Sequence, residues 1–421
     1  MNQSFRSSIL IALSLLIAAS AFAGTKGAAL TGDYPNLFKS YLGKTDAEVQ
    51  AKLDAAWQHF FRGDPETQSL YYVLDDGTAY VPDINNRDVR SEGLSYGMMI
   101  AVQLNKQDEF DRIWRYAKKC MYKTEGPFKG YFTWHTAYNG SMTRDDGTEV
   151  RGDGPAPDGE EWFVMALFFA SHRWGDGEGD LNYGAHAREI LHTMMHKEDE
   201  PDHGPATNML VRDVAQINFT PHPPGSTFTD PSYHLPSFYE LWTRWTEDAD
   251  DKAFLARLAP TSRQLFRNAA HPKTGLMPDY SHFDGKPYVL QRRPMHKDFR
   301  YDAWRTLSNP AMDWVWWRAD PWAIEQSNRV LTFLASQGDA LAPCYTLEGE
   351  PIAGNDKPVG LIAMAGAAAL AADREIGEPW VRKLWEMDFS EGRYRYYSGL
   401  LHFLALLQVS GNFRVYGEVA P

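Results

Sequence analysis

Three acidic segments have the residue types and neighbours that acid–base chemistry requires. The first is RSEGLSYGMM (residues 90–99), in which Ser91 can cap a helix and Glu92 would lie in its first turn. An acidic residue there can simply complement the helix dipole. The following turns are apolar, however, and a carboxyl group packed among them loses hydration, so that its pKa rises toward the range of a general acid. The residues alone favour neither interpretation.

The other two segments also have structural explanations when each is taken alone. In GPAPDGEEW (residues 154–162), Pro157 keeps the chain extended before Asp158, which can cap a helix that begins at Gly159. In YDAWR (residues 301–305), Asp302 precedes Arg305 by three positions, a spacing typical of an ion pair on a helix. Asp313 follows eleven residues after Asp302. None of these motifs is specific by itself.

Helical periodicity recurs along the chain and defines the elements that must position these residues. Thr45 and Glu48 form a capping box, followed by Val49, Leu53, Trp57 and Phe60 at helical spacing. Further helices are predicted over 91–105, 109–122, 159–174, 183–196, 237–247, 252–270, 301–317, 322–337, 359–372, 380–387 and 397–409. Strand signals are short: residues 70–73 and 78–81 flank an Asp-Gly turn, and 130–136 resembles a ribbon. About a dozen helices without a linker predict an all-α fold, an α/α toroid with small β-ribbons, although an open helix bundle is also possible.

Composition narrows the possible partners. The 421 residues carry a net charge of −13, which argues against nucleic acid because binding phosphates requires a basic surface. Aromatic residues are abundant, with 14 Trp, 21 Tyr and 22 Phe. A single Trp such as Trp134 can be explained by core packing. As a group, flat rings in an acidic protein suit the binding of sugars, and we expect Trp134 to contact substrate.

The first 23 residues have the features of a signal peptide. Arg6 is followed by a short apolar stretch, residues 9–19, and by the small-x-small site Ala21-Phe22-Ala23. Cleavage would leave one domain, 24–421, with a net charge of −14, and no second membrane span is expected. The protein is therefore predicted to be exported to the periplasm or the extracellular space, without a membrane contact after cleavage. We expect its two cysteines, Cys120 and Cys344, to stay unbridged, since a large core does not need a disulfide.

Taken together, the segments resemble family 8 of the glycoside hydrolases, and within it the exo-oligoxylanases that release xylose from the reducing end. The resemblance extends from about Tyr34 to Tyr416. Its strongest blocks are VRSEGLSYGMMIAVQ (89–103), GPAPDGEEWFVMALFFASHRW (154–174), DPSYHLPSFYEL (230–241) and RYYSGLLHFLALLQVSGNF (395–413).

The resemblance implies an (α/α)6 barrel and inverting hydrolysis of β-1,4-linked glycans. By position, Glu92 corresponds to the proton donor, Asp302 to the base that activates water, and Asp158 to the carboxylate that holds the sugar ring. It also implies that Arg305, Tyr233 and Tyr397 line the groove. An inverting enzyme needs its acid and base about 6.5–9.5 Å apart, with water between the base and the sugar.

The loop over residues 354–360 indicates which bond of the substrate would be cleaved. In exo-acting members a His-Pro pair closes the groove beyond the first reducing-side sugar, and the matching stretch here is GNDKPVG (354–360), with Lys357 at the position of the histidine. Lys357 can still donate hydrogen bonds to a terminal sugar. We predict release of xylose from the reducing end of xylo-oligosaccharides by a monomer. The alternative is an endo-acting family 8 xylanase or glucanase.

Two other function classes share features with this sequence. A polysaccharide lyase would share the toroid and could use Tyr233 and His234, but its anionic substrate conflicts with the charge of the chain. A non-catalytic glycan-binding protein would leave the oligosaccharide intact. No HExxH motif is present, and neither a metal nor another cofactor is expected.

Overall fold

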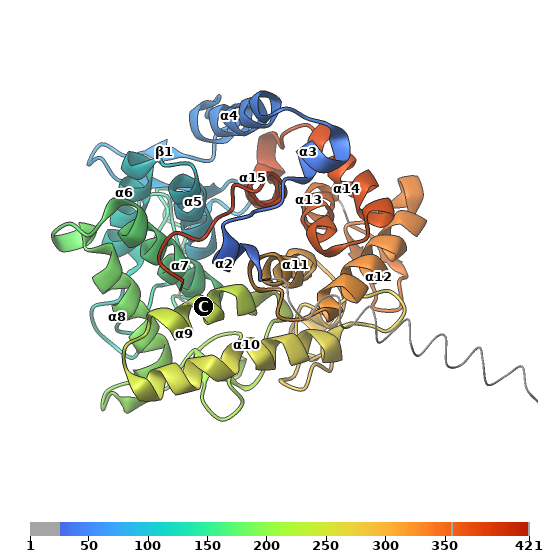
Figure 1. Cartoon of the computed structure of the whole chain (residues 1–421). Coiled ribbons are helices and arrows are strands. Elements are labelled where there is room, and N and C mark those ends of the chain that lie inside the picture. Colours follow the sequence, from blue (N-terminus) through green and yellow to red (C-terminus); the bar gives the residue numbers. More distant parts are fainter. Residues whose placement is uncertain (1–25, 355–356, 420–421) are drawn as a thin grey trace, which may run out of the picture.

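Twelve helices alternate between an inner and an outer layer of a ring within residues 26–354 and 357–419, the parts of the chain that the computed structural model describes (Figure 1). The inner helices are α5 (Ser91–Gln103), α7 (Pro157–Trp174), α9 (Pro236–Trp245), α11 (Arg305–Trp317), α13 (Val359–Ala368) and α15 (Arg395–Val409). The outer helices are α4 (Asp46–Arg62), α6 (Gln107–Tyr116), α8 (Tyr183–His196), α10 (Ala249–Ala269), α12 (Trp322–Ser336) and α14 (Arg374–Glu386). This is the predicted α/α toroid.

Residue patterns explain the two layers. Every residue of α11 is buried, and α5 and α15 are buried almost throughout, as expected for helices surrounded on all sides. The outer helix α4 instead buries one face, including Val49, Leu53 and Trp57, and it begins with the predicted capping box of Thr45 and Glu48. Amphipathic helices thus form the outer layer and apolar helices line the inside.

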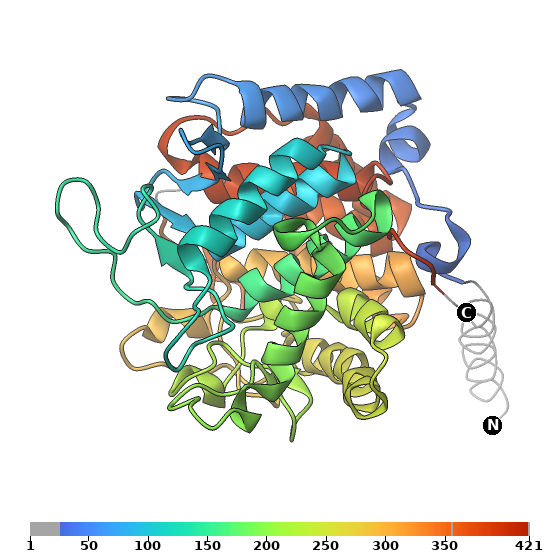
Figure 2. The same cartoon turned by 90° about the vertical axis from the view of Figure 1, so that its left-hand side faces the viewer.

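Contacts between neighbouring inner helices close the ring. Helix α5 packs against both α7 and α15, while α11 packs against α9 and α13. Between α7 and α9, the hydroxyl of Tyr239 donates to the carboxyl group of Glu161, and the rings of Trp162 and Phe238 meet edge to face. After a turn of 90° about the vertical axis, the ring is seen from the side, with α4 (blue) at its top (Figure 2).

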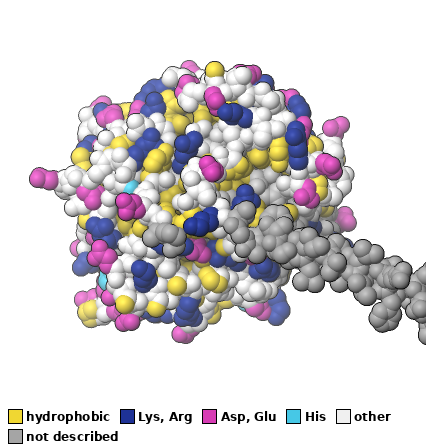
Figure 3. Space-filling view, in the orientation of Figure 1, with side chains coloured by type: hydrophobic (Ala, Val, Ile, Leu, Met, Phe, Trp, Pro, Cys, Tyr) yellow, Lys and Arg dark blue, Asp and Glu magenta, His cyan; other side chains and the backbone are white. Residues whose placement is uncertain are grey.

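All inner helices run in the same direction, so their N-terminal ends meet at one end of the barrel. The opposite end is covered by α2 (Ala28–Thr31) and the C-terminal segment. There, the amide of Arg414 donates to Gln103 Oε1 at the end of α5, and the amide of Val415 donates to the hydroxyl of Tyr34. On the face seen in Figure 3, acidic and basic side chains are interspersed.

Short antiparallel ribbons lie between the helices. They are β1 (Tyr72–Val73) with β2 (Ala79–Tyr80), β3 (Pro82–Asp83) with β4 (Asp88–Arg90) and β5 (His135–Thr136), β6 (Leu210–Val211) with β7 (Gln216–Ile217), and β8 (Cys344–Tyr345) with β9 (Pro351–Ile352). The hairpin at the Asp-Gly turn is as predicted. In the predicted 130–136 ribbon only His135–Thr136 is a strand, and it pairs with β4 just before Glu92.

Several predicted boundaries were wrong. The 109–122 helix ends at Tyr116 and continues as a π-helical turn, Ala117–Met121, and the 301–317 helix is preceded by a 3₁₀ turn, η7 (Asp302–Trp304). Helix α14 begins at Arg374 rather than at 380. The predicted start was wrong because Pro379, which normally marks a helix boundary, lies inside this helix. Helices α2 and α3 (Leu37–Leu42) were not predicted.

Two other sequence predictions concern the chain as a whole. The predicted signal peptide, 1–23, lies outside the described residues. In the described part, no helix is long and apolar enough to cross a bilayer, and Cys120 and Cys344 form no disulfide with each other.

Candidate active site

The N-terminal ends of the inner helices bring the predicted carboxylates together. Glu92 lies in the first turn of α5, Asp158 is the second residue of α7, and Asp302 lies in the η7 turn that leads into α11. Each helix N-terminus carries unpaired amide groups and a partial positive charge, which favours acidic side chains. Segments more than 200 residues apart in the sequence thereby meet at one end of the barrel.

Arg305, the first residue of α11, connects all three carboxylates. Its Nη1 lies 3.0 Å from Asp158 Oδ2 and 3.4 Å from Glu92 Oε2, and its Nη2 lies 3.4 Å from Asp302 Oδ1. Nη1 also donates to the hydroxyl of Tyr96 at 2.8 Å. The guanidinium therefore places one positive charge between the three carboxylates.

The shared guanidinium also limits the separation of the predicted acid and base. Both Glu92 and Asp302 have an oxygen 3.4 Å from a terminal nitrogen of Arg305. Because the guanidinium has a fixed planar geometry, these oxygens are at most about 9 Å apart. That limit is compatible with the ~6.5–9.5 Å separation of inverting glycosidases.

The carboxylates differ in their access to water. The side chain of Asp302 is 36% exposed, whereas those of Glu92 and Asp158 are 13% and 8% exposed. Of the three, Asp302 can best hold a water molecule, as a base in hydrolysis must. Asp158 is fixed from two sides, because its Oδ1 accepts from the amide of Gly159 at 2.9 Å while Oδ2 contacts Arg305.

Burial makes Glu92 suited to carry a proton. Desolvation raises the pKa of Glu92 to about 8, Arg305 opposes the shift, and Asp158 and Asp302 add to it. The group is therefore protonated at neutral pH, as a general acid must be. The hydroxyl of Tyr396 on α15 donates to Glu92 Oε1 at 3.1 Å, which leaves Oε2 on the side of Arg305. Burial also raises the pKa of Asp158, against the effect of Arg305.

Close helix packing depends on two glycines beside the carboxylates. A Cβ atom at Gly159 would lie 2.4 Å from Ser91 Oγ, and one at Gly93 would lie 2.6 Å from the ring of Tyr396. The absence of side chains lets α5 approach α7 on one side and α15 on the other. Glu92 is thereby held against both neighbouring helices.

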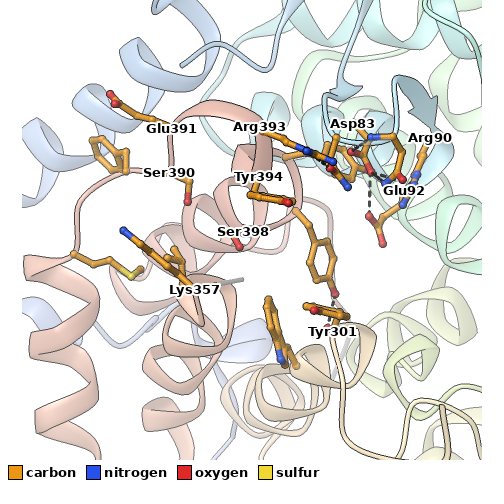
Figure 4. A pocket seen from close by; sticks show the side chains of 18 of the residues that line it. Asp83, Arg90, Glu92, Tyr301, Lys357, Ser390, Glu391, Arg393, Tyr394 and Ser398 are labelled. Atoms are coloured by element: carbon orange, nitrogen blue, oxygen red, sulfur yellow. Dashed lines mark hydrogen bonds and ion pairs between the residues drawn. The ribbon is translucent and has the colours of Figure 1, made fainter. Parts of the chain in front are cut away.

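A cleft of ≈ 1150 Å³ opens beside these carboxylates. Glu92 and Asp302 line it, together with Arg90, several aromatic side chains and further charged side chains. The other lining residues include Asp83, Asn85, Tyr301, Trp304, Lys357, Ser390, Glu391, Arg393, Tyr394, Tyr396 and Tyr397. Figure 4 shows Glu92 and Lys357 on opposite sides of the cleft, with Tyr394 and Tyr301 nearby.

The remaining predicted residues lie at different distances from this cleft. Tyr397 lines it and donates to the carbonyl of Tyr301 at 3.0 Å. Tyr233 and Trp134 are not among its lining residues. The ring of Tyr233 lies under the guanidinium of Arg305, and the ring of Trp134 stacks on His135 beside Arg90. Tyr233 therefore adjoins Arg305, and Trp134 adjoins Arg90, without lining the cleft.

Asp313 and His234 have structural surroundings. Asp313 is 2% exposed and accepts two hydrogen bonds of 2.8 Å from Arg263 of α10. His234 is fully buried between Thr229 and Ser262, and burial lowers its pKa to about 3. A histidine enclosed in this way cannot abstract a proton from a polymer, which counts against the lyase alternative.

Sequence reasoning missed two tyrosines of the site: the hydroxyl of Tyr396 donates to Glu92, and the hydroxyl of Tyr96 accepts from Arg305. Tyr96 and Tyr396 both lie in blocks that carry the resemblance, yet nothing in the sequence distinguishes Tyr396 from its neighbour Tyr397 as the partner. Arg90 was also missed: it pairs with Asp83 and Asp88 and lies over the rings of Trp134 and Tyr396. Its position two residues before Glu92 was the only available signal.

Comparisons with known proteins give one matching family and several similar proteins. The profile of Glycosyl hydrolases family 8 matches residues 66–411. The reducing-end xylose-releasing exo-oligoxylanase Rex8A of Paenibacillus barcinonensis is 44% identical over 93% of the chain and 99% of its own length. The reducing end xylose-releasing exo-oligoxylanase of Halalkalibacterium halodurans is 40% identical over 93% and 97%. The structure of a catalytic mutant xylanase from Teredinibacter turnerae in complex with xylohexaose is 44% identical, covers 93% of this chain and 100% of that one, and has a TM-score of 0.85.

Proposed function

Because the chain belongs to family 8 of the glycosyl hydrolases, we propose that it hydrolyses β-1,4-xylosidic bonds in xylo-oligosaccharides and releases xylose from the reducing end. The substrate class is supported by the two similar exo-oligoxylanases and by the xylohexaose complex of the similar xylanase. The acidic, aromatic cleft provides hydroxyl acceptors and ring faces for a neutral sugar chain.

The observation that carries the proposal is the arrangement of three unequal carboxylates around Arg305. In the proposed reaction, protonated Glu92 gives its proton to the glycosidic oxygen, and the leaving xylose departs as an alcohol. Asp302 takes a proton from water as that water attacks the anomeric carbon from the opposite face, so the product has inverted configuration. Asp158 accepts a hydrogen bond from the sugar at the cleavage point and, with Arg305, fixes its position.

The exo mode of action rests on the loop that contains Lys357. Its side chain lines the cleft opposite Glu92, where a sugar beyond the first leaving xylose would have to pass. An ammonium group there can donate hydrogen bonds to the terminal hydroxyls of a single leaving sugar. We propose that this contact selects xylose as the leaving group.

An endo-acting xylanase is the second candidate, favoured by the extent of the same cleft. Lining residues continue to Ser390 and Glu391, so space exists past Lys357. A similar protein with a xylohexaose complex is described only as a xylanase. If Lys357 does not close the path, longer leaving chains would fit.

Hydrolysis of xylotetraose labelled at its reducing end tests the proposal. Label that appears first in xylose supports exo action, whereas label mainly in xylobiose or xylotriose contradicts it. Lys357→Ala should increase the share of labelled xylobiose, and Lys357→His should reduce it. Proton NMR of the first products should show the α-anomer, while a β-anomer would contradict inversion. Glu92→Gln, purified in the same way, controls for contaminating xylanases.

The proposal includes export and a monomeric state. Cleavage after Ala23 would release the mature chain, 24–421, to the periplasm or beyond. Mass spectrometry of the protein from its native host should show a chain that begins at Gly24. Light scattering after gel filtration should give the mass of one chain, and a dimer would contradict that part of the proposal.

A further inference from the structure

Two histidines and an aspartate converge on the outer layer of the barrel, away from the cleft. His192 and His196 are four residues apart on α8, so they share one helix face, and their rings stack 4.3 Å apart. Asp251 belongs to the first turn of α10 and is buried. One ligand atom from each residue lies within 4.8 Å of the other two. In Figure 1, the end of α8 lies beside the start of α10.

The orientation of His196 is typical of a metal ligand. Its Nε2 lies 2.7 Å from Asp251 Oδ1, and its Nδ1 lies 2.7 Å from Asp199 Oδ2. Histidines that bind metals usually donate their second ring N–H to a carboxylate, which fixes the tautomer and the ring plane. Asp199 fills that role here, and Nε2 is then directed at Asp251. His192, by contrast, is exposed, and its ring makes no hydrogen bond with a side chain of the described residues.

We propose that His192, His196 and Asp251 bind a divalent transition metal ion, best matched by Zn²⁺, which joins α8 to α10. Two imidazoles and one carboxylate are a donor set that zinc prefers, with a water molecule as the fourth ligand. Zinc ligands lie ~2.0–2.2 Å from the ion. The exposed His192 ring can rotate to meet that distance, while the hydrogen bond between His196 Nε2 and Asp251 Oδ1 must open so that both atoms can face the ion.

The charged groups around the cluster carry more negative than positive charge, which favours a cation. Arg212 Nη2 is 3.0 Å from His196 Nδ1 and 3.9 Å from Asp251 Oδ1, so this guanidinium opposes a metal ion. Two carboxylates, Asp199 and Asp251, outweigh it, and the side chain of Arg212 is 40% exposed and can move toward solvent. Asp248 and Asp250, at the start of α10, add negative charge nearby.

None of the three proposed ligands lines the cleft. The metal would therefore be structural and separate from hydrolysis. It would link α8 to α10, the outer helices that follow α7 and α9. Helix α7 carries Asp158, and α9 begins shortly after Tyr233.

The test uses the full chain after treatment with EDTA and dialysis. ZnCl₂ is titrated at pH 7.5 by calorimetry and, independently, in competition with a chromophoric chelator. We expect about one Zn²⁺ per chain with a micromolar or lower Kd. His192→Ala should weaken binding at least tenfold, because it removes one of three ligands while changing only an exposed side chain. His186→Ala, on the same helix but outside the cluster, is the matched control and should bind like the wild type.

Thermal unfolding gives a second measurement. Zinc at 100 times its Kd should raise the Tm of the wild type and of His186→Ala by at least about 2 °C, and should not raise that of His192→Ala. Rates of xylotetraose hydrolysis should be equal with and without EDTA. The proposal is wrong if no zinc binds up to about 1 mM, or if wild type and His192→Ala bind zinc equally. Asp251→Asn should also lose binding, but the exposed His192 decides the outcome if that variant does not fold.

Discussion

At the scale of single residues, burial rather than residue type differentiates the three carboxylates. One guanidinium cannot neutralise Glu92, Asp158 and Asp302 together, so a carboxyl group that is buried and has only a long contact with the guanidinium keeps its proton. Glu92 is buried and its contact with Arg305 is longer than that of Asp158. Asp302 is partly hydrated and close to the same positive charge. Acid and base are thus set apart by their surroundings.

Replacement of Glu92 by Gln should remove proton donation while keeping the shape of the side chain. We expect kcat on xylotetraose to fall about 10²–10⁴-fold, with Tm nearly unchanged. A dinitrophenyl β-xylobioside needs no proton on its leaving group and should be cleaved at a rate close to that of the wild type. A variant that lost activity on both substrates equally would show that Glu92 does not act as the acid.

The pKa of Glu92 should also set the alkaline limit of activity. Because its pKa is raised to about 8, kcat/KM should fall as the pH rises through about 8 and the proton is lost. Tyr396 donates to the carboxylate and so favours its ionised form. Tyr396→Phe should therefore move the alkaline limb upward by about half a unit or more. An unchanged or lowered limb would mean that another group sets it.

At the scale of elements, the η7 turn and α11 separate two aspartates that the sequence places eleven residues apart. Asp302 lies in the turn at the cleft, while Asp313 lies within the helix and pairs with Arg263 of α10. The first is available to water and the second holds an inner helix to an outer one. Different losses are therefore expected from the same chemical change.

Asp302→Asn should abolish hydrolysis and leave the Tm close to that of the wild type. Asp313→Asn breaks one partner of a buried ion pair, and should cost about 3 kcal/mol of folding free energy, the lower end of the usual range because Glu240 still pairs with Arg263. The folded Asp313→Asn protein should keep most of its kcat. Denaturant unfolding and initial rates measure both effects, and the reverse pattern would reassign the base.

The contact between α5 and α7 gives a second element-scale prediction. In Gly159→Ala the new methyl group would meet Ser91 Oγ at 2.4 Å, so the helix ends that carry Glu92 and Asp158 must separate. A displacement of about 1 Å can cost roughly 10²-fold in rate, and we expect a loss of that order. The double variant Ser91→Gly/Gly159→Ala removes the clashing side chain and should recover much of the rate. No recovery would mean that the close approach is not what Gly159 provides.

Helix positions could be read from the sequence because apolar spacing and caps are local. The Thr45 capping box and the 183–196 helix match the structure directly. The start of α14 could not be predicted, since a proline normally marks a boundary and Pro379 lies within this helix. The packing of α14 against the neighbouring helices allows a proline inside it, and that packing cannot be predicted from the local sequence.

The candidate site could be predicted in its residues but not in its connections. Glu92, Asp158, Asp302 and Arg305 stand in recognisable segments, and the structure brings them together. That one arginine contacts all three depends on how six helix ends meet. Adjacent helix residues point about 100° apart, so only closure of the ring directs Tyr396 rather than Tyr397 toward Glu92. The His192–Asp251 cluster likewise needs two helices placed side by side.

At the scale of the whole molecule, the barrel buries more acid than its reaction uses. Glu160, Glu161 and Asp230 are fully buried, and each has one carboxyl oxygen without a hydrogen-bond partner among the described residues. Burial raises the pKa of all three well above the usual range. Above their ordinary pKa near 4, the native state therefore binds more protons than the unfolded chain. By linkage, the contribution of these three groups to stability must fall as the pH rises from that value toward their folded pKa values.

Replacing Glu161 by Gln tests this account, because it removes one such proton and keeps the carbonyl oxygen that accepts from Tyr239. Each pH unit between the unfolded and folded pKa costs the wild type about 1.4 kcal/mol at this group, and the neutral amide has no such cost. The difference in Tm between Glu161→Gln and wild type should therefore become more positive as the pH rises from about 5 toward the raised pKa of Glu161 in the folded state. The double variant Tyr239→Phe/Glu161→Gln is the control, because it also removes the hydrogen bond from the hydroxyl of Tyr239. Its Tm should differ from that of Glu161→Gln by the same amount at every pH. Differential scanning calorimetry in buffers of equal ionic strength measures the series. A difference that stays constant with pH would show that Glu161 does not bind its proton more tightly in the folded barrel than in the unfolded chain.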